Sequence, residues 1–377
     1  LNEVGGDPRR FGVSVSAFHR TMRDRAAKTP YALSSTATHD AKRGEDARLR
    51  IDALSELTAR ARRALVRLER INRRHKRDVD GSSAPDRLDE WFLYQTLIGA
   101  WPLEALDAEP SEPIASPAFT ERIQTTMRKA IREAKRHTSW ANPLLAYEDA
   151  TAAFVAAVLG ESRDSPFWLE FRRIAEPAAR IAMVHGLAQV VLKLTAPGAP
   201  DVYQGAELWD FSLVDPDNRR PVDWILRERI AASLPARGEE SSAVAAALLG
   251  NWRDGRVKMF VTRTLLRLRE TRREMFLNDE YAALETVGQY AGHVVALERR
   301  GAIAIVPRLV GALGGDVTPP LGATWGDTGV LTSHRRTAQS YRDLFTREIV
   351  RTSGEPLRVA EVLSHFPVAV LLPEDEA

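Results

Sequence analysis

Helical periodicity runs almost without interruption from Glu45 to Leu194. Apolar residues recur there every three or four positions among charged ones, the spacing of amphipathic helices that bury one face. The predicted helices cover residues 48–74, 88–100, 116–137, 149–160 and 165–193. Ser116 and Pro117 form a start signal for the third helix. Segments rich in Pro and Ser separate the first helix from the second, at 81–86, and the second from the third, at 107–117. The chain therefore contains a large, entirely helical region.

Strand patterns lie on both sides of this region. Before it, residues 31–38 combine β-prone and small apolar residues, which predicts a short buried strand ending at His39 and Asp40. After it, Pro and Gly break any helix over residues 194–210. Further helices are predicted over 227–234, 242–251 and 256–274. Short alternating segments with Gly-rich turns then predict an antiparallel β-domain over residues 279–377.

Composition excludes several classes of protein. The 377 residues include 53 Lys and Arg, 51 Asp and Glu and no Cys. Without Cys there is no disulfide framework, thiolate nucleophile or Cys-ligated zinc, which suits a cytoplasmic protein. The most apolar stretch, Ile181 to Leu194, carries His185, Gln189 and Lys193, and no apolar run reaches the roughly 18 residues of a membrane span. The first twelve residues lack the basic and apolar regions of a signal peptide. We expect no membrane partner.

Two segments, 59–78 and 122–137, are densely basic. A basic patch of this kind is typical of binding to nucleic acid. However, both segments keep apolar residues at helical spacing with Glu among the cations, and the net charge of the chain is only +2. We therefore favour two solvated, salt-bridged helix faces and expect no nucleic-acid partner.

The first candidate site is Thr38-His39-Asp40, followed by Lys42 and Arg43. Polar residues at the carboxyl end of a strand occupy the place where (β/α)8 barrels carry their active sites. A carboxylate beside a His can bind sugar hydroxyls and stabilise an oxocarbenium-like charge, and the two cations can tune its ionisation. The alternative is structural: Asp40 would cap a helix that begins near Lys42.

Two further candidates follow in the chain. The segment 194–210 contains Tyr203, Gln204, Glu207 and Trp209, side chains that could stack on and hydrogen-bond a sugar, or simply close a turn. The loop 212–224 gathers charged and amide side chains in a pattern that lacks the Gly and final Glu of an EF-hand. Those residues are Asp215, Asp217, Asn218, Arg219 and Arg220. A salt-bridged turn explains this loop equally well.

In combination, these segments resemble the α-amylase superfamily of glucan-active (β/α)8 barrels. The motifs that carry the resemblance are STATHDAKRGED, LTAPGAPDVYQGAELWD and LVDPDNRRPVDW, in that order. In that superfamily a His-Asp pair ends the seventh strand, PGxPxxYxGxE marks the eighth, and a DPDNRxP loop follows. LNEVGGDPRRFG, FLYQTLIGAWP, KAIREAKRHTSW and SHFPVAVLLP are similar to one family within it, the maltooligosyltrehalose synthases, which are (1→4)-α-D-glucan 1-α-D-glucosylmutases.

The resemblance implies an α/β fold followed by a β-domain. The strand 7 region of the barrel would occupy residues 1–46, and a large helical insertion residues 47–180. The strand 8 region with its following helices would occupy 181–277, and a C-terminal antiparallel β-sandwich 278–377. An insertion of about 150 residues between two barrel strands far exceeds an ordinary connection, which makes it the most discriminating feature.

The resemblance also implies a mechanism. Asp40 matches a third catalytic aspartate, which hydrogen-bonds sugar hydroxyls and favours the positively charged transition state. The substrate-binding residues that the resemblance implies are His39, Lys42, Arg43, Tyr203, Gln204, Glu207, Asp215, Asp217, Asn218 and Arg219. The reaction converts the reducing-end α-1,4 bond of a maltooligosaccharide into an α,α-1,1 bond through a covalent glycosyl-enzyme, and it needs no cofactor or metal. We expect four aromatic residues of the helical region to help exclude water: Trp91, Tyr94, Trp101 and Trp140.

The superfamily takes its nucleophilic aspartate and its acid/base glutamate from the fourth and fifth strands. Glu3 and Asp7 do not replace them, because the family places this turn-rich segment between the fifth and seventh strands. We therefore expect a C-terminal fragment that is inactive alone and poorly soluble without the N-terminal remainder of the barrel. Ala41, Gly44 and His185 stand where the family pattern has Thr, Ser and Asn, which leaves fine substrate contacts open.

Two alternatives remain. Another glucan hydrolase or transferase of the superfamily would release reducing sugar instead of trehalose-ended product. A non-catalytic helical module would bind nucleic acid or protein through its basic helices, with a strong dependence on salt.

Overall fold

The structure, a computed structural model, describes Asp7, Arg9 and residues 12–103, 114–277, 280–333 and 339–374. Glu3 and most of the predicted loop at 107–117 lie outside the described residues. The chain divides into two compact units. The helical unit comprises residues 41–179 and 211–220, and the mixed unit comprises residues 1–40, 180–210 and 221–377. None of the described helices is long and apolar enough to cross a membrane. The predicted limits of the barrel regions stay a prediction.

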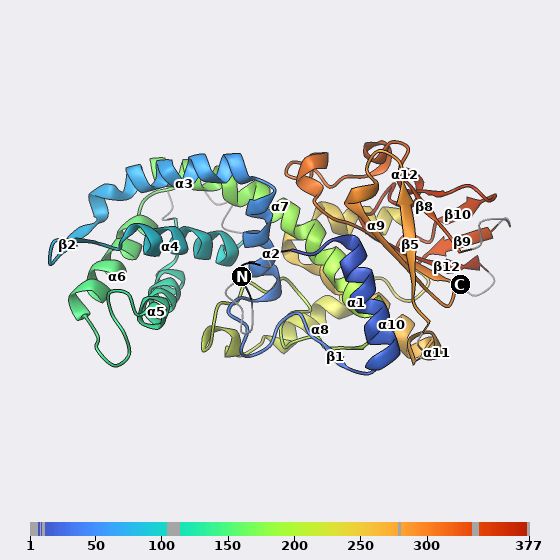
Figure 1. Cartoon of the computed structure of the whole chain (residues 1–377), viewed down its shortest axis with the longest axis horizontal. Helices are drawn as coiled ribbons and strands as arrows, with labels where there is room; N and C mark the ends of the chain where they lie inside the picture. The colour runs from blue at the N-terminus through green and yellow to red at the C-terminus, as the bar shows by residue number, and fades with distance from the viewer. Residues whose placement is uncertain are drawn as a thin grey trace. The chain divides into compact units, whose positions relative to one another are not determined.

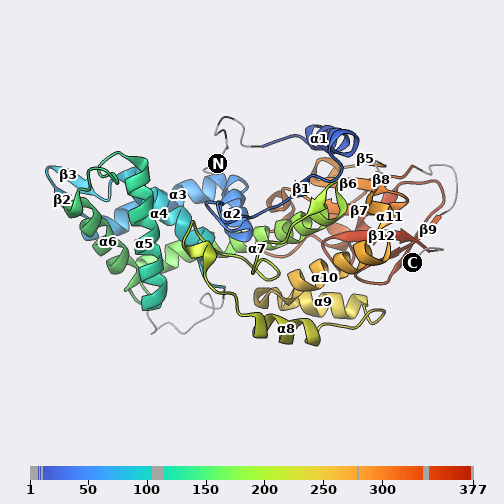
Figure 2. The same cartoon turned by 90° about the horizontal axis from the view of Figure 1, so that it is seen from below.

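The helical unit is built from amphipathic helices with local start signals. Its elements are α2 (Glu45–Asp52), η1 (Ala53–Ser55), α3 (Thr58–Asn72), η2 (Arg73–His75), β2 (Arg77–Val79), β3 (Ser82–Ala84), α4 (Arg87–Ala100), α5 (Pro117–Ala134), α6 (Leu145–Leu159), the first part of α7 (Pro166–Thr195) and η4 (Asp217–Arg219). Ser116 accepts a hydrogen bond from the Phe119 N–H (3.2 Å), so the predicted cap of α5 is confirmed. In this unit α3 packs on α7 through Ala61, Ala64 and Ile174 (Figures 1 and 2).

Two local predictions for this unit are wrong in detail. The predicted helix 48–74 is interrupted after Asp52, where the short η1 turn precedes α3. The predicted linker at 81–86 is partly a hairpin, because β2 and β3 pair in antiparallel fashion around Gly81. Gly81 takes φ +79°, a conformation that favours glycine. Local turns thus interrupt the helical periodicity that appears continuous in the sequence.

Aromatic side chains form much of the core of the helical unit. The Trp101 ring lies 5.0–5.3 Å from the rings of Phe119, Trp168 and Phe171. Tyr94 is fully buried, and its hydroxyl donates to Glu90 (2.5 Å). The expectation that Tyr94 and Trp101 enclose a substrate is therefore wrong, because neither side chain reaches a surface.

Several cations of the two basic segments pair with acidic residues of the same unit. Arg67 lies 3.3 Å from Glu170, and Arg132 donates to both oxygens of Glu148 (2.8 and 2.6 Å). Arg74 pairs with Glu161. Pairs of this kind lower the local positive charge, as expected for a salt-bridged helix face.

The mixed unit begins with α1 (Val15–Lys28), which leads into the two-residue strand β1 (Leu33–Ser34). β1 pairs in parallel with β4 (Ala199–Pro200), which follows the second part of α7. The predicted strand over residues 31–38 is much shorter and is not buried, since Leu33 is 77% exposed. Among the described residues only β4 pairs with β1, so one side of the strand stays uncovered.

The rest of the mixed unit contains helices and one large sheet. The helices are α8 (Trp224–Ser233), α9 (Ser242–Gly250), η5 (Trp252–Asp254), α10 (Arg256–Thr271), α11 (Glu274–Leu277), η6 (Ala291–His293), η7 (Val310–Leu313), η8 (Gly322–Trp325) and α12 (Val359–Val362). The strands are β5 (Ala282–Val287), β6 (Val294–Arg299), β7 (Ala302–Pro307), β8 (Gly329–Leu331), β9 (Gln339–Asp343), β10 (Ile349–Thr352), β11 (Leu357–Arg358) and β12 (Ala369–Pro373).

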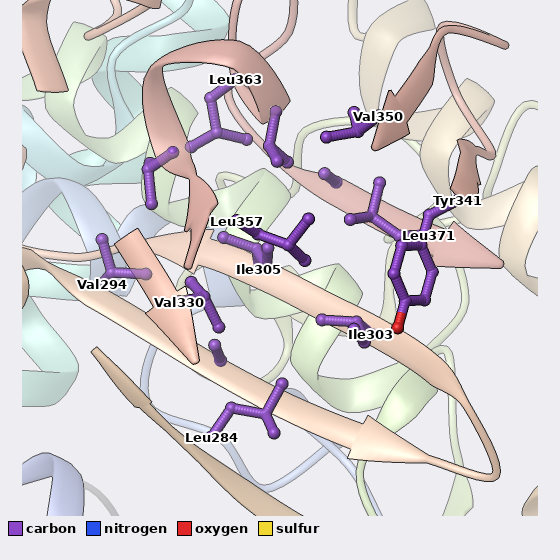
Figure 3. Packing of buried hydrophobic residues seen from close by; sticks show 14 of the residues in the cluster. Leu284, Val294, Ile303, Ile305, Val330, Tyr341, Val350, Leu357, Leu363 and Leu371 are labelled. Carbon is purple, nitrogen blue, oxygen red and sulfur yellow. The ribbon is translucent and has the colours of Figure 1, made fainter. Parts of the chain in front are cut away.

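These eight strands form a single antiparallel sheet in the order β10-β9-β12-β7-β6-β5-β8-β11. All eight strands contribute to one hydrophobic cluster, from Leu284 in β5 to Val350 in β10 and Leu371 in β12 (Figure 3). The antiparallel β-domain is confirmed. Its predicted sandwich is corrected to one sheet around a shared core, because the eight strands follow one another in a single hydrogen-bonded order.

Candidate functional site

The His39-Asp40 turn lies directly after β1. The Asp40 N–H donates to Thr38 Oγ1 (3.2 Å), and His39 Nε2 lies 3.2 Å from Asp40 Oδ2. Both side chains are about two-thirds exposed, at 60% and 67%. The alternative role for Asp40 as a helix cap is wrong, because α2 begins five residues later, at Glu45, with Gly44 as its N-cap. The exposed His-Asp pair is thus available to a ligand.

The pairing of β1 with β4 positions the second candidate segment. The Ala199 N–H donates to the Ala32 carbonyl (3.0 Å), and the Asp201 N–H donates to the Ser34 carbonyl (2.8 Å). The chains approach so closely that a Cβ on Gly198 would lie 2.5 Å from Ser34 Oγ. Because the strands are parallel, the segments that follow them leave the same edge of this pair.

The segment after β4 turns sharply at Tyr203, Gln204 and Gly205. The Ala206 N–H donates to the Tyr203 carbonyl (2.9 Å), and Gly205 takes φ +89°. Glu207 pairs with Arg227 of α8 (3.1 Å), and Arg227 also donates to the Gly205 carbonyl (2.8 Å). Gln204 is exposed, whereas Glu207 is held by α8. The binding roles predicted for Tyr203, Gln204 and Glu207 stay predictions.

In the helical unit, the loop 211–220 is held by two cations of α5. Arg122 donates to both oxygens of Asp217 (2.7 and 2.8 Å), whose side chain is only 9% exposed. The Leu213 N–H also donates to Asp217 (2.7 Å). Lys129, seven residues after Arg122 and hence on the same face of α5, donates to the Asp215 carbonyl (2.6 Å). The loop therefore has a defined conformation.

The same loop packs against the segment that carries Lys42 and Arg43. The Gly44 N–H donates to the Ser212 carbonyl (2.7 Å), and Asn218 Nδ2 lies 3.4 Å from the Ala41 carbonyl. Arg43 donates to Thr96 of α4 (3.1 Å) and lies over the Phe92 ring. Arg43 and the largely buried Asn218 thus make structural contacts.

Lys42 connects this segment to the end of α5. It lies 3.2 Å from Glu133, and Lys129 approaches the other oxygen of Glu133 at 4.0 Å. In the loop itself Asp215 pairs with Arg219 (3.0 Å), and both side chains are partly exposed. Within the helical unit the structure therefore brings together Lys42, Asp215, Asp217, Asn218 and Arg219.

A cavity of about 440 Å³ lies between α5 and the loop 211–220. Its lining residues are Ala118, Glu121, Arg122, Thr125, Thr126, Lys129, Val214, Asp215, Pro216, Asp217 and Arg220. This volume lies in the range of small-molecule sites. The sequence analysis missed the α5 side of the cavity. The spacing of residues 122, 125, 126 and 129 places them on one face of α5, which is the signal in the sequence for this wall of the cavity. The sequence instead predicts a solvated face for the same segment.

A second hollow of about 420 Å³ lies in the mixed unit and includes His185, Gln189, Lys193, Arg25 and Arg308. Burial lowers the pKa of His185 to about 4, with a smaller contribution from the charge of Arg308. His185 is therefore neutral near pH 7. Lys193 donates to Thr36 (2.8 Å), which joins α7 to the residues after β1.

One cluster has the residue types of a metal site. The ligand atoms of Asp86, Asp89 and His137 lie within 4.8 Å of one another. However, the Arg136 guanidinium pairs with Asp86 and lies 3.5 Å from Asp89, and the Tyr147 hydroxyl donates to Asp89 (2.5 Å). The Arg136 guanidinium already offsets one of the two carboxylate charges and occupies both carboxylates, so the residues fit a structural role better than a cation site.

We predict that Arg122→Ala destabilises the helical unit by roughly 3 kcal/mol, because it leaves the buried Asp217 carboxylate without its main partner. The measurement is urea unfolding followed by circular dichroism. Arg128→Ala is the matched control on the same helix, since Arg128 is 47% exposed and lies 3.8 Å from Glu148. It should cost less than about 1 kcal/mol. Equal losses for the two variants would contradict the prediction.

Comparisons with known proteins show which sequences and structures the chain is similar to. No protein-family model matches the chain. A Mycobacterium tuberculosis protein named as a maltooligosyl trehalose synthase is 40% identical over 299 residues, which are 79% of this chain and 34% of that protein. The solved maltooligosyltrehalose synthase of Arthrobacter ramosus is 35% identical with a TM-score of 0.77, and the match covers 99% of this chain and 42% of that one.

A more distant solved structure is similar as well. The hypothetical maltooligosyl trehalose synthase of Sulfolobus tokodaii is 28% identical with a TM-score of 0.69, and the match covers 98% of this chain and 43% of that one. The chain thus spans 34% of the curated relative and less than half of these solved structures. By sequence and fold, the chain is homologous to the maltooligosyltrehalose synthases and corresponds to a part of them.

Proposed function

We propose that this chain supplies part of the active site of a maltooligosyltrehalose synthase, an isomerase that acts on maltooligosaccharides in trehalose biosynthesis. The observation that supports it most is the exposed His39-Asp40 pair after β1, in a chain homologous to such synthases. In this proposal β1 and β4 are the seventh and eighth strands of a (β/α)8 barrel, and the helical unit is the insertion between them. The reaction takes place in the cytoplasm.

The proposed reaction moves one glycosidic bond. An aspartate attacks the anomeric carbon of the penultimate glucosyl unit, and the reducing-end glucose leaves as its oxygen accepts a proton from an acid/base glutamate. That glucose turns in the site, and its anomeric hydroxyl attacks the glycosyl-enzyme while the glutamate takes back the proton. The product has an α,α-1,1 bond, and the aspartate is released unchanged. No redox step occurs.

Asp40 acts on the glucosyl unit that becomes positively charged. Its carboxylate accepts hydrogen bonds from two ring hydroxyls, and these bonds strengthen as charge develops at the anomeric carbon. His39, whose Nε2 lies 3.2 Å from that carboxylate, holds the carboxylate in place. The site has to exclude water, because hydrolysis competes with the return of the released glucose.

A hydrolase of the same superfamily is the alternative reaction, and the products distinguish the two. A nucleic-acid-binding module is disfavoured by the pairing of Arg67, Arg74 and Arg132 with carboxylates. Binding to nucleic acid needs cationic side chains that can contact the phosphates and displace the counterions condensed on them.

The nucleophile and the acid/base lie, in this proposal, in the part of the synthases outside the match. We predict that the isolated 377-residue chain forms no trehalose-ended product from maltopentaose. The same chain, completed with the remaining segment of such a synthase, should convert reducing ends into non-reducing ones. Chromatography with a reducing-sugar assay measures both. Product from the isolated chain would contradict the division of the site, and release of reducing glucose alone by the completed protein would favour the hydrolase.

A further inference from the structure

We propose that the 440 Å³ cavity between α5 and the loop 211–220 is a binding subsite for a glucosyl unit of an α-glucan chain. The inference rests on the proposed function and extends it to residues of α5 that no sequence motif indicated. Glu121 and Thr125 are the polar groups of α5 that are exposed at this cavity.

The walls of the cavity are preorganised. Arg122 binds Asp217 through two hydrogen bonds and also donates to the Phe211 carbonyl at the start of the loop. Lys129 binds the Asp215 carbonyl (2.6 Å). A ligand that enters therefore does not have to order the loop, which lowers the entropic cost of binding.

The charges at the cavity favour an uncharged ligand. Its lining carries three cations, Arg122, Lys129 and Arg220, and three carboxylates, Glu121, Asp215 and Asp217, so the formal sum is zero. A phosphate or another polyanion finds no excess of positive charge here, and a cation finds no excess of negative charge. The lining instead offers both carboxylate acceptors and ammonium or guanidinium donors.

A sugar ring matches this chemistry. Each hydroxyl can donate to a carboxylate and accept from a cation or from the Thr125 hydroxyl. Ala118, Val214 and Pro216 provide an apolar surface for the C–H face of the ring. Thr126 is not available to the ligand in the same way, because its hydroxyl already donates to the Arg122 carbonyl (3.0 Å). Glu121, Thr125 and Asp215 are therefore the groups we assign to the sugar.

The test fills the cavity without touching the contacts that hold the loop. In the full 377-residue chain, Thr125→Trp places an indole in the opening from an exposed helix position. Leu169→Trp, at a 53% exposed position on α7 of the same unit, is the matched control. Calorimetry with maltoheptaose should show binding to the unmodified chain and to the control. Thr125→Trp should weaken binding by about tenfold or more.

Glu121→Gln provides a second variant, because it removes a charged acceptor while keeping the size of the side chain. It should weaken maltoheptaose binding by about three- to tenfold. Equal affinity in the unmodified chain and Thr125→Trp would overturn the subsite, as would no binding of maltoheptaose at millimolar concentration. If inorganic phosphate binds to the unmodified chain and Thr125→Trp abolishes that binding, the assignment of the cavity to an uncharged sugar is overturned.

Failure of the proposed function can be distinguished from failure of the subsite. If the completed protein forms only reducing sugars while Thr125→Trp still weakens maltoheptaose binding, the subsite holds and the synthase assignment does not. If trehalose-ended product forms and Thr125→Trp leaves the KM for maltoheptaose unchanged, the synthase assignment holds and the subsite is overturned.

Discussion

Asp40→Asn should lower the kcat of the completed synthase by about 10²- to 10³-fold, because a neutral amide replaces the charge that stabilises the oxocarbenium-like transition state. The fold should be unaffected. The Asp40 side chain is 67% exposed, and the backbone bond from its own N–H to Thr38 remains in the variant. The free energy of unfolding should therefore change by less than about 0.5 kcal/mol. Initial rates of trehalose-end formation at saturating maltopentaose measure the effect.

A control of equal exposure separates charge loss from site chemistry. Asp24 of α1 is 69% exposed in the same unit and makes a surface pair with Lys28 (3.4 Å). Asp24→Asn should leave kcat within about twofold, since a surface pair contributes little. If Asp40→Asn keeps the activity of the unmodified protein, Asp40 is not the third catalytic carboxylate and the proposed role of the turn is wrong.

Trp101→Ala should be the most destabilising aromatic substitution in the helical unit. The ring is 2% exposed and lies against Phe119, Trp168 and Phe171. Removing it leaves a cavity that these packed rings cannot fill, which predicts a loss of about 3–5 kcal/mol in the free energy of unfolding. Urea unfolding followed by far-UV circular dichroism measures this change. The result would establish Trp101 as a core residue instead of a wall of the substrate site.

Trp140→Ala is the comparison for the same residue type. Trp140 is 58% exposed, and its ring is contacted by the Arg132 guanidinium at 4.8 Å. Loss of one exposed cation–π contact should cost no more than about 1 kcal/mol. Arg132 keeps its two bonds to Glu148 in the variant. A Trp140→Ala effect as large as that of Trp101→Ala would contradict the assignment of these two residues to surface and core.

Several elements were predictable because their signals are local. The α5 start follows from Ser116 and Pro117, and α4 and α7 follow their apolar spacing closely. The strands β5, β6, β7 and β12 follow from alternating residues between Gly-rich turns. The short strands β9 and β11 carry no such local signal, because a few residues at a sheet position need the neighbouring strands to define them.

The candidate site divides in the same way. The His39-Asp40 pair and the loop 212–224 could be identified as motifs in the sequence, because Pro, Gly and charged residues stand together there. The partner of Asp217 was not visible, since Arg122 lies 95 residues away in the chain. A basic helix face looks the same in sequence whether its cations meet solvent or a distant loop.

By itself, the sequence determined the helical region, the β-domain and the resemblance that led to the synthases, because periodicity, caps and motif words depend on neighbouring residues. Only the tertiary structure decided that β1 pairs with β4, that Tyr94 and Trp101 are buried and that α5 closes a cavity over the loop 211–220. The physical reason is range. Burial, strand pairing and the compensation of charge depend on residues that are distant in the chain and adjacent only after folding.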